Sequence, residues 1–349
     1  MRAAGRRATP LPMSKPPFHV RVRGDGIAAH GGVRLLRAAG LAVGFDRVAR
    51  PPVPVLMLSD QALALMCDVF ASPAVFADLP RIDRRVVAWG PDADPVAVDH
   101  GAVVLSETQL IAGLAVQEDA APDPAPDFTI HTASPMPTGE RHRFGDRRAV
   151  AVRVALTDPA DRSTCWVEAL PGGWLFLLPG AAGVDWLLAV GAPPVELLAD
   201  SRLIAGRVEL LDSGSAAFDT CPRIHWPLTG PDWIGCGTAA LGFDPICGDG
   251  TAQAVREAIL ATAVVAGIAR GEAAAPLLAH YEAVMLAGLR RHLMLSAQFY
   301  RSGGTGGWWR DQLAALAAGE RWCADRLAGT PPPRFRLVDF DLVPIGDAA

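Results

Sequence analysis

Lysine is almost absent from this chain of 349 residues: its only lysine is Lys15, close to the N-terminus. Arginine supplies the rest of the positive charge. No lysine beyond residue 15 is therefore present to act as a general base, as an acid or as a Schiff-base former. Mechanisms that require a lysine in the folded core are excluded.

Clustered cysteines, long apolar runs and excess positive charge are also lacking. The six cysteines are scattered without a Cys-x-x-Cys pair, so we interpret them as reduced, buried small residues and expect no metal site. No run of about 18 apolar residues is free of charges or helix breakers, so we expect no membrane-spanning helix. The formal net charge of −5 disfavours a nucleic-acid partner.

The N-terminal segment is rich in arginine and lacks the apolar core of a secretory signal peptide. We predict a disordered tail over residues 1–17, with Met13 as an alternative start of the chain. Half of the residues are hydrophobic, which is enough for a full core, and the length favours about two lobes. These observations together predict a cytoplasmic protein.

A first glycine-rich turn lies between a short strand and a helix. Residues 18–24 alternate as a strand does, the helix that follows ends at Gly40, and residues 41–45 fit a second strand that ends at Asp46. The turn between the first strand and the helix follows a Gly-x-Gly-x-x-Ala pattern and reads Gly24-Asp25-Gly26-Ile27-Ala28-Ala29.

This layout is typical of a dinucleotide-binding turn, in which the helix N-terminus faces the phosphates. We predict that Gly24, Gly26 and Ala29 hold a dinucleotide, and that Asp46, 20 residues after Gly26, binds its adenosine ribose. Asp25 weakens this interpretation, because its negative charge would repel phosphates unless it points outward. An ordinary glycine-rich turn, with Asp46 solvated at a strand end, is the alternative.

A second glycine-rich segment occurs much later in the chain. Residues 233–237 fit a buried strand, small residues follow at 237–240, and a long helix runs from Thr251 to about residue 269. A turn with Pro245, Gly248 and Gly250 ends at the N-terminus of this helix. Its backbone N–H groups and the helix dipole favour a ligand that carries partial negative charge.

The second segment resembles the FAD-dependent monooxygenases and flavin halogenases. In that family a strand leads into Gly-Asp-Ala-Ala, and Asp-Pro-x-x-Gly-x-Gly then opens a helix; this segment holds the ribityl chain and brings the helix N-terminus near the flavin ring. The sequence departs from the pattern at Thr238, where the family has aspartate, and threonine lacks the acceptor strength of a carboxylate. It matches at Gly237, Ala239, Ala240, Asp244, Pro245, Gly248 and Gly250.

Four further segments are similar to the family and follow its order: residues 85–90, 104–110, 128–134 and 168–179. In the second of these, Glu107 stands where an arginine is usual. The resemblance covers about residues 18–300 and implies FAD as the cofactor. The implied FAD-binding residues are Gly24, Gly26, Ala29, Asp46, Gly237, Thr238, Pro245, Gly248 and Gly250.

We predict an α/β fold with an FAD-binding Rossmann-like parallel sheet, an antiparallel substrate-side sheet and C-terminal helices. Residues 18–148 and 207–300 would form a discontinuous FAD-binding domain, 149–206 the antiparallel sheet, and 301–349 a C-terminal helix and tail. The acidic, proline-rich residues 118–127 predict a loop. We expect the tryptophans of this region to be core residues, and the alternative is that they form an aromatic wall of a substrate pocket. They are Trp166, Trp174, Trp186, Trp226 and Trp233.

Two residues are candidates for chemistry. His225 lies just upstream of the second glycine turn and would face the pocket, and Asp244 would form a hydrogen bond near the flavin. The alternatives are a hydrogen-bonded structural histidine and an aspartate that caps a helix or a turn. No nucleophile elbow or metal cluster is evident.

The resemblance implies an FAD-dependent monooxygenase that hydroxylates an aromatic substrate, either a small molecule or a tryptophan of a partner protein, with an external reductant or reduced flavin as the electron source. A halogenase is disfavoured, because that branch relays the hypohalous species through a lysine and Lys15 lies in the tail. The alternative is an accessory protein, such as one that assists quinone cofactor maturation, which binds FAD weakly or not at all. Departures from the family pattern motivate it: Ala29, Glu107, Ser134 and Thr238.

Overall fold

The structure is a computed structural model and describes residues 17–114, 116, 125–180, 183–248, 250–331 and 333–345. Residues 1–16 of the predicted tail, and most of the loop predicted at 118–127, lie outside the described residues.

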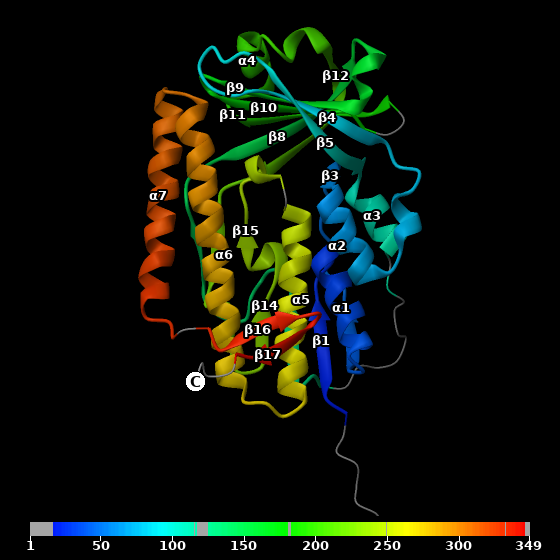
Figure 1. Cartoon of the computed structure of the whole chain (residues 1–349), viewed down its shortest axis with the longest axis vertical. Helices are drawn as coiled ribbons and strands as arrows, with labels where there is room; N and C mark the ends of the chain where they lie inside the picture. The colour runs from blue at the N-terminus through cyan, green and yellow to red at the C-terminus, as the bar shows by residue number, and fades with distance from the viewer. Residues whose placement is uncertain are drawn as a thin grey trace, which may run out of the picture.

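A four-stranded parallel sheet forms the lower part of the molecule (Figure 1). Its strands, in spatial order, are β14 (Trp233–Gly235), β6 (Phe128–His131), β1 (His19–Arg23) and β2 (Ala42–Asp46), and α1 (Ile27–Ala38) connects β1 to β2. This βαβ unit confirms the prediction from the alternating and helical patterns. The chain moves from β1 to β2 on one side, whereas β6 lies on the other, so the turn after β1 lies at the switch point where such sheets bind ligands.

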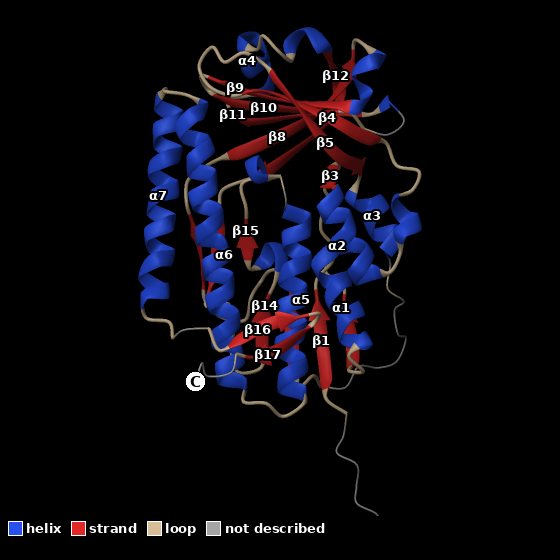
Figure 2. Cartoon of the chain, viewed as in Figure 1, coloured by secondary structure: helices blue, strands red, loops and turns tan. Residues whose placement is uncertain are grey.

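An eight-stranded sheet lies above the parallel sheet (Figure 2). Its neighbouring strands are antiparallel except for the parallel pair β4 and β9. Because its strands come from residues 56–105 as well as 148–219, it extends past the boundaries predicted at residues 149 and 206. In spatial order they are β12 (Val208–Asp219), β8 (Arg148–Leu156), β11 (Asp185–Gly191), β10 (Gly173–Leu178), β9 (Thr164–Leu170), β4 (Arg81–Ala88), β5 (Val96–Leu105) and β3 (Leu56–Ser59).

Three long helices complete the predicted α/β fold. The apolar helix α5 (Gly250–Ala269) packs on α1. By length and composition it could cross a membrane, but 78% of its most apolar window is buried, as in the core helix of a globular protein. Helices α6 (Ala274–Gly303) and α7 (Gly307–Ala328) pack side by side along one flank (Figure 1). The shorter helices are α2 (Asp60–Phe70), α3 (Glu107–Leu114) and α4 (Pro194–Asp200).

Two small antiparallel sheets lie beside these layers. One consists of β15 (Leu241–Gly242), β13 (Arg223–Trp226) and β7 (Glu140–Arg143). The other is a hairpin of β16 (Phe335–Val338) and β17 (Asp341–Pro344), where the sequence predicted only a tail. β17 packs on α5 and buries Leu342, which is only 4% exposed, so this contact orders the C-terminal segment.

The N-terminus of α1 touches the turn that follows β14. Gly237 begins the single turn η5 (Gly237–Ala239) and has a left-handed φ of +63°. A Cβ atom at this position would lie only 2.9 Å from the Cβ of Ala28. Only glycine satisfies both constraints, because other residues strain this backbone and would collide with α1. The two glycine-rich segments are thus held in direct contact.

We predict that Gly237→Ala lowers the free energy of unfolding by about 3 kcal/mol, because it combines left-handed strain with a forced contact. Gly248→Ala is the matched control: Gly248 has a φ of +68°, but a Cβ there would meet nothing within 4 Å. This control should lose only about 1 to 2 kcal/mol. Urea unfolding measures both, and equal losses would show that the Ala28 contact is not tight.

Candidate functional site

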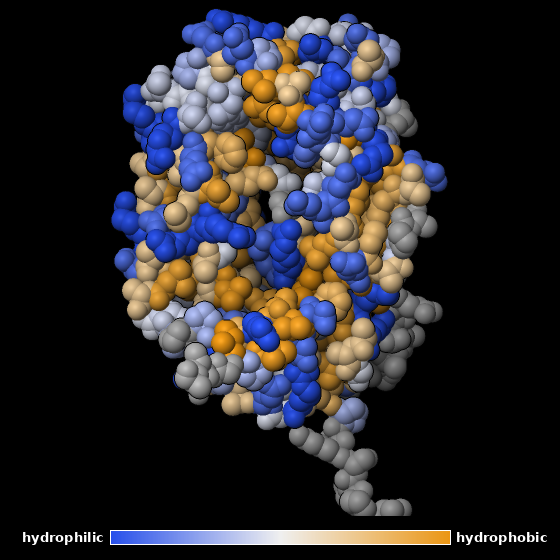
Figure 3. Space-filling view, in the orientation of Figure 1, coloured by the Kyte–Doolittle hydropathy of each residue, from blue (hydrophilic) through white to orange (hydrophobic). Residues whose placement is uncertain are grey.

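Both glycine-rich turns line one cavity of about 420 Å³. It lies between the helices around the parallel sheet and the larger sheet, in a region where Figure 3 shows the surface hollowed. The structure therefore brings together two segments that are far apart along the chain. The residues predicted for the site that line this cavity are Gly26, Ala29, Gly237, Thr238, Asp244, Pro245, Gly248 and Gly250.

The first turn presents the N-terminus of α1 to the cavity. Gly26 is the N-cap residue, and no side chain forms a cap hydrogen bond there. The first N–H groups of a helix have no partner within the helix, and together with the helix dipole they favour an anion. The cavity wall at Gly26, Ile27 and Ala28 is therefore suited to a phosphate group.

Four charged side chains surround this turn. Asp25 pairs with Arg47, with 3.2 Å between Oδ2 and Nη2. Arg50 forms a two-pronged ion pair with Glu107: Nη1 donates to Oε2 over 2.9 Å, and Nη2 donates to Oε1. A Cβ on Gly26 would lie 2.7 Å from Nη2 of Arg50, so this guanidinium lies across the glycine where a pyrophosphate was predicted.

The second turn combines a small exposed residue with a buried acid. The side chain of Thr238 is exposed in the cavity wall. Glu257, on α5, accepts the N–H of Gly237 over 2.8 Å, and burial raises its pKa to about 8. Because this pKa lies above 7, the Glu257 carboxyl is mainly neutral at pH 7 and adds little negative charge to the cavity.

Aromatic and aliphatic side chains of the larger sheet form the opposite wall, where Phe176, Trp186 and Phe218 line the cavity with Phe243 of the second segment. Of the five tryptophans considered from the sequence, Trp186 alone is among the cavity-lining residues. Trp166, Trp174 and Trp233 are at most 5% exposed, which agrees with the expectation that they are core residues.

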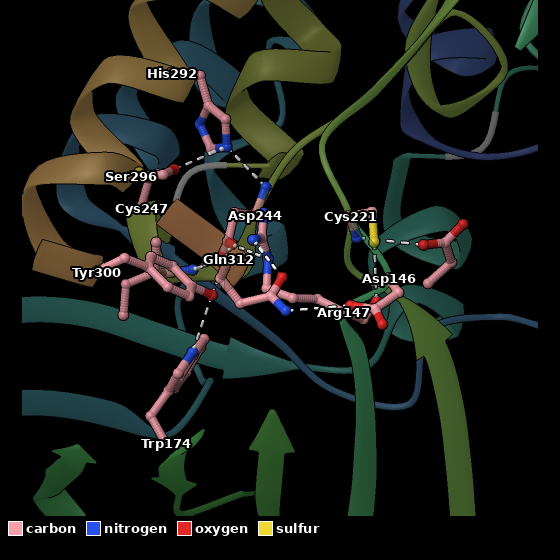
Figure 4. A network of polar contacts seen from close by, with 12 residues as sticks. Asp146, Arg147, Trp174, Cys221, Asp244, Cys247, His292, Ser296, Tyr300 and Gln312 are labelled. Carbon is pink, nitrogen blue, oxygen red and sulfur yellow. Dashed lines mark hydrogen bonds and ion pairs between the residues drawn. The ribbon is translucent and has the colours of Figure 1, made fainter. Parts of the chain in front are cut away.

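Asp244 lies at the centre of a buried polar network that reaches the cavity wall (Figure 4). Its Oδ2 lies 2.9 Å from Nε of Arg147, and both side chains are fully buried. The same oxygen accepts the hydroxyl of Tyr300 over 2.8 Å, whereas Oδ1 accepts the N–H of Ile246 over 3.0 Å. With both oxygens engaged, this carboxylate is suited to hold the 243–248 turn in place.

Helix α6 also contacts this turn (Figure 4). The N–H of Asp244 donates to Nε2 of His292 over 2.7 Å. Burial, followed by the nearby Arg147, lowers the pKa of His292 to about 4, so the ring is neutral at pH 7 and its nitrogen is free to accept. Arg147 also donates to Gln312 on α7 over 2.9 Å, which ties both C-terminal helices to the cavity wall.

Three predicted site residues do not line the cavity. Gly24 packs against Thr132 at the end of β6. Asp46 pairs with Arg23 at 3.5 Å at the exposed end of β2, so ribose binding by Asp46 stays a prediction. The ring of His225 is hydrogen-bonded to the carbonyl of Thr138 over 2.6 Å, an arrangement expected of the structural alternative, and a catalytic role for it also stays a prediction.

Four residues of the site were not predicted from the sequence: Arg50, Arg147, Glu257 and Tyr300. Two of them carry a signal in the sequence. Glu257 is an isolated acid beside the apolar run of α5, and Tyr300 is one of only two tyrosines, both of which are fully buried. No local pattern marks the two arginines, because their partners lie 57 and 97 positions away in the sequence.

Solved structures with the same fold include proteins described as flavin-dependent or solved with FAD. QhpG, a peptidyl tryptophan dihydroxylase essential for tryptophylquinone cofactor biogenesis, matches with a TM-score of 0.68 at 20% identity, over 85% of this chain and 78% of that chain. CmlS, a flavin-dependent halogenase, matches with a TM-score of 0.70 at 17% identity, over 93% and 75%. HpxO of Klebsiella pneumoniae, solved with FAD and uric acid, matches with 0.57 at 14%, over 90% and 93%.

These likenesses confirm the resemblance at the level of the fold, which is that of FAD-dependent monooxygenases and halogenases. No family profile and no curated protein sequence matches the chain.

We predict that Arg147→Ala lowers the free energy of unfolding by about 3 to 5 kcal/mol, because it leaves the buried carboxylate of Asp244 without its cation. The control is Arg202→Ala, which breaks an ion pair with Asp92 whose side chains are 83% and 80% exposed. It should cost about 1 kcal/mol or less. Urea unfolding of both variants decides the matter, and similar losses would mean that the buried pair contributes no more than a surface pair.

Glu257 makes the stability of the protein depend on pH. Its pKa rises from 4.5 to about 8 on folding, so the folded state holds more protons between these values. This contribution to stability is complete below pH 4.5 and is lost as the pH rises to about 8. Relative to wild type, Glu257→Gln should therefore gain up to about 1.4 kcal/mol per pH unit in this window. Urea unfolding at several pH values measures the difference, and a difference that is constant with pH would contradict the assignment.

Proposed function

We propose that this protein is an FAD-dependent monooxygenase that hydroxylates an aromatic group. The observation that carries the proposal is that the turns at 24–29 and 237–250, which are remote in sequence, line a single cavity. The fold shared with flavin enzymes supports the same conclusion.

The lining residues are suited to successive parts of FAD, from the pyrophosphate through the ribityl chain to the flavin ring. Gly26, Ala29 and the uncapped N-terminus of α1 would hold the pyrophosphate. Gly237 and Thr238 would contact the ribityl chain. Pro245, Gly248 and Gly250 would lie beside the flavin ring, where the N-terminus of α5 favours partial negative charge. The pair of Arg50 and Glu107 would have to rearrange to admit the pyrophosphate, because Nη2 of Arg50 lies against Gly26.

The other end of the cavity is suited to an aromatic substrate. Phe176, Trp186 and Phe218 offer apolar faces that would orient a ring and exclude water. Bound flavin supplies the redox chemistry of oxygen activation, and the protein contributes orientation and a dry pocket. The network around Asp244 would fix the turn beside the flavin ring, so we assign Asp244 a positioning role.

Hydroxylation is favoured over halogenation, because no lysine stands in the described residues and Lys15 lies outside them. The electrons would come from an external reductant or from reduced flavin. Within the aromatic class, a tryptophan carried by a partner protein is a specific candidate, because QhpG, which has the same fold, is described as a peptidyl tryptophan dihydroxylase.

A second candidate is an accessory protein that does not use FAD. The observation that favours it is the pair of carboxylates, Asp25 and Glu107, beside the predicted phosphate turn. Their charge would weaken the binding of a pyrophosphate. FAD binding by the purified protein separates the two candidates.

We predict that the wild-type protein, mixed with FAD and then desalted, retains the flavin absorbance near ~450 nm. Thr238→Trp should lose it, because the large ring would fill the cavity from an exposed position that the core does not need. Thr305→Trp is the control, since Thr305 is also exposed but lies between α6 and α7, away from the cavity. A colourless wild type would contradict the assignment as an FAD enzyme, and equal retention by Thr238→Trp would refute the proposed site.

A further inference from the structure

The first glycine turn has a charge arrangement that is unusual for a site meant to receive a dianion. Two acids and two arginines surround it, namely Asp25 with Arg47 and Glu107 with Arg50, and their formal charges cancel. Asp25 also faces His30, whose Nε2 lies 3.4 Å away. The turn therefore presents no net positive charge from these side chains, although helix N-terminal N–H groups are available.

Glu107 is held firmly in its position. Its Oε2 accepts the N–H of Val53 over 2.8 Å, its own N–H donates to the carbonyl of Val53 over 3.0 Å, and its side chain is only 9% exposed. Arg50 is less enclosed, with 35% of its side chain exposed, and its Nε donates to the carbonyl of Asp25 over 3.2 Å. The carboxylate is thus the fixed member of the pair and the guanidinium the movable one.

The geometry of the pair is that of phosphate recognition. A guanidinium binds a carboxylate and a phosphate through the same two-pronged arrangement of parallel N–H groups. Arg50 uses this arrangement on Glu107 while its Nη2 lies against Gly26, the glycine that was expected to let a pyrophosphate approach. A pyrophosphate on this turn would meet the Arg50 guanidinium first.

We propose that Glu107 is an internal anion that occupies the place of the cofactor's pyrophosphate on Arg50, and that Arg50 passes from Glu107 to the pyrophosphate when FAD binds. This inference rests on the proposed function. Glu107 then lowers the affinity for FAD in two ways, because it competes for Arg50 and because its charge repels the phosphates. The protein would bind FAD more weakly than its cavity alone allows.

The test compares FAD affinity in Glu107→Gln, Arg50→Gln and wild type, measured by quenching of flavin fluorescence. Glutamine keeps an acceptor for the N–H of Val53 but loses the charge, so Glu107→Gln should bind FAD about tenfold more tightly. Arg50→Gln should bind about tenfold more weakly, because the two-pronged contact is lost. The control is Glu320→Gln, which removes one negative charge and an ion pair with Arg290 remote from the cavity and should match wild type.

Two further probes tie the effect to the phosphates. ADP, which has the pyrophosphate without the flavin, should show the same order of affinities in calorimetry, whereas riboflavin, which has no phosphate, should bind all variants alike. Thermal unfolding without ligand completes the set. If Glu107 only supports the fold, Glu107→Gln lowers the midpoint of unfolding and leaves the affinity for FAD unchanged.

The possible outcomes test the exchange of Arg50 and the proposed function separately. If wild type binds FAD and Glu107→Gln binds it equally well or more weakly, the exchange of Arg50 is wrong and the proposed function stands. If only Glu107→Gln binds FAD, Glu107 excludes the pyrophosphate instead of yielding Arg50 to it, so the exchange is wrong and the wild type is no FAD enzyme. If no variant binds FAD or ADP, both proposals fail.

Discussion

The approach of Ala28 to Gly237 is the contact on which the cavity depends. It joins the N-terminus of α1 to the turn after β14, and so places two helix N-termini, those of α1 and α5, on one cavity. Neither turn alone forms a site, since each offers only a few N–H groups to solvent. Because the contact is between backbone and a methyl group, a side chain of any size at 237 would separate the two halves.

The two ends of the cavity are built with different stiffness. Around Asp244 the ion pair with Arg147 is fully buried, and hydrogen bonds from α6 and α7 surround it, so any displacement would leave a charge unpaired in a medium of low polarity. Around Gly26 both arginines are partly exposed, with 46% of the Arg47 side chain and 35% of the Arg50 side chain accessible, so these guanidinium groups can move more easily than the buried Arg147. The 243–248 turn is therefore fixed, whereas the phosphate end is adjustable.

Local patterns in the sequence were sufficient for the βαβ unit, because alternation, a helical period and a terminal glycine each depend on neighbouring residues. They were not sufficient for the larger sheet, since β3, β4 and β5 alternate in the same way whichever sheet they join. The turns at Gly26 and Gly237 were predictable from glycine spacing. Arg50 and Arg147 were not, because an arginine in a loop shows its role only when folding brings a distant acid to it.

The pairing of the acids at the first turn with arginines does not by itself distinguish an enzyme from an accessory protein. Glu107 and Asp25 need cationic partners for folding whether or not a cofactor binds, since a buried or partly buried acid without one is costly. The cavity is the better discriminator. The cavity of about 420 Å³ is lined by apolar side chains and by the uncapped N-terminus of α1. These groups therefore make fewer packing contacts and hydrogen bonds than they would in a filled core. An anionic ligand with a flat aromatic part would supply both at once, and binding to the folded state alone would stabilise it.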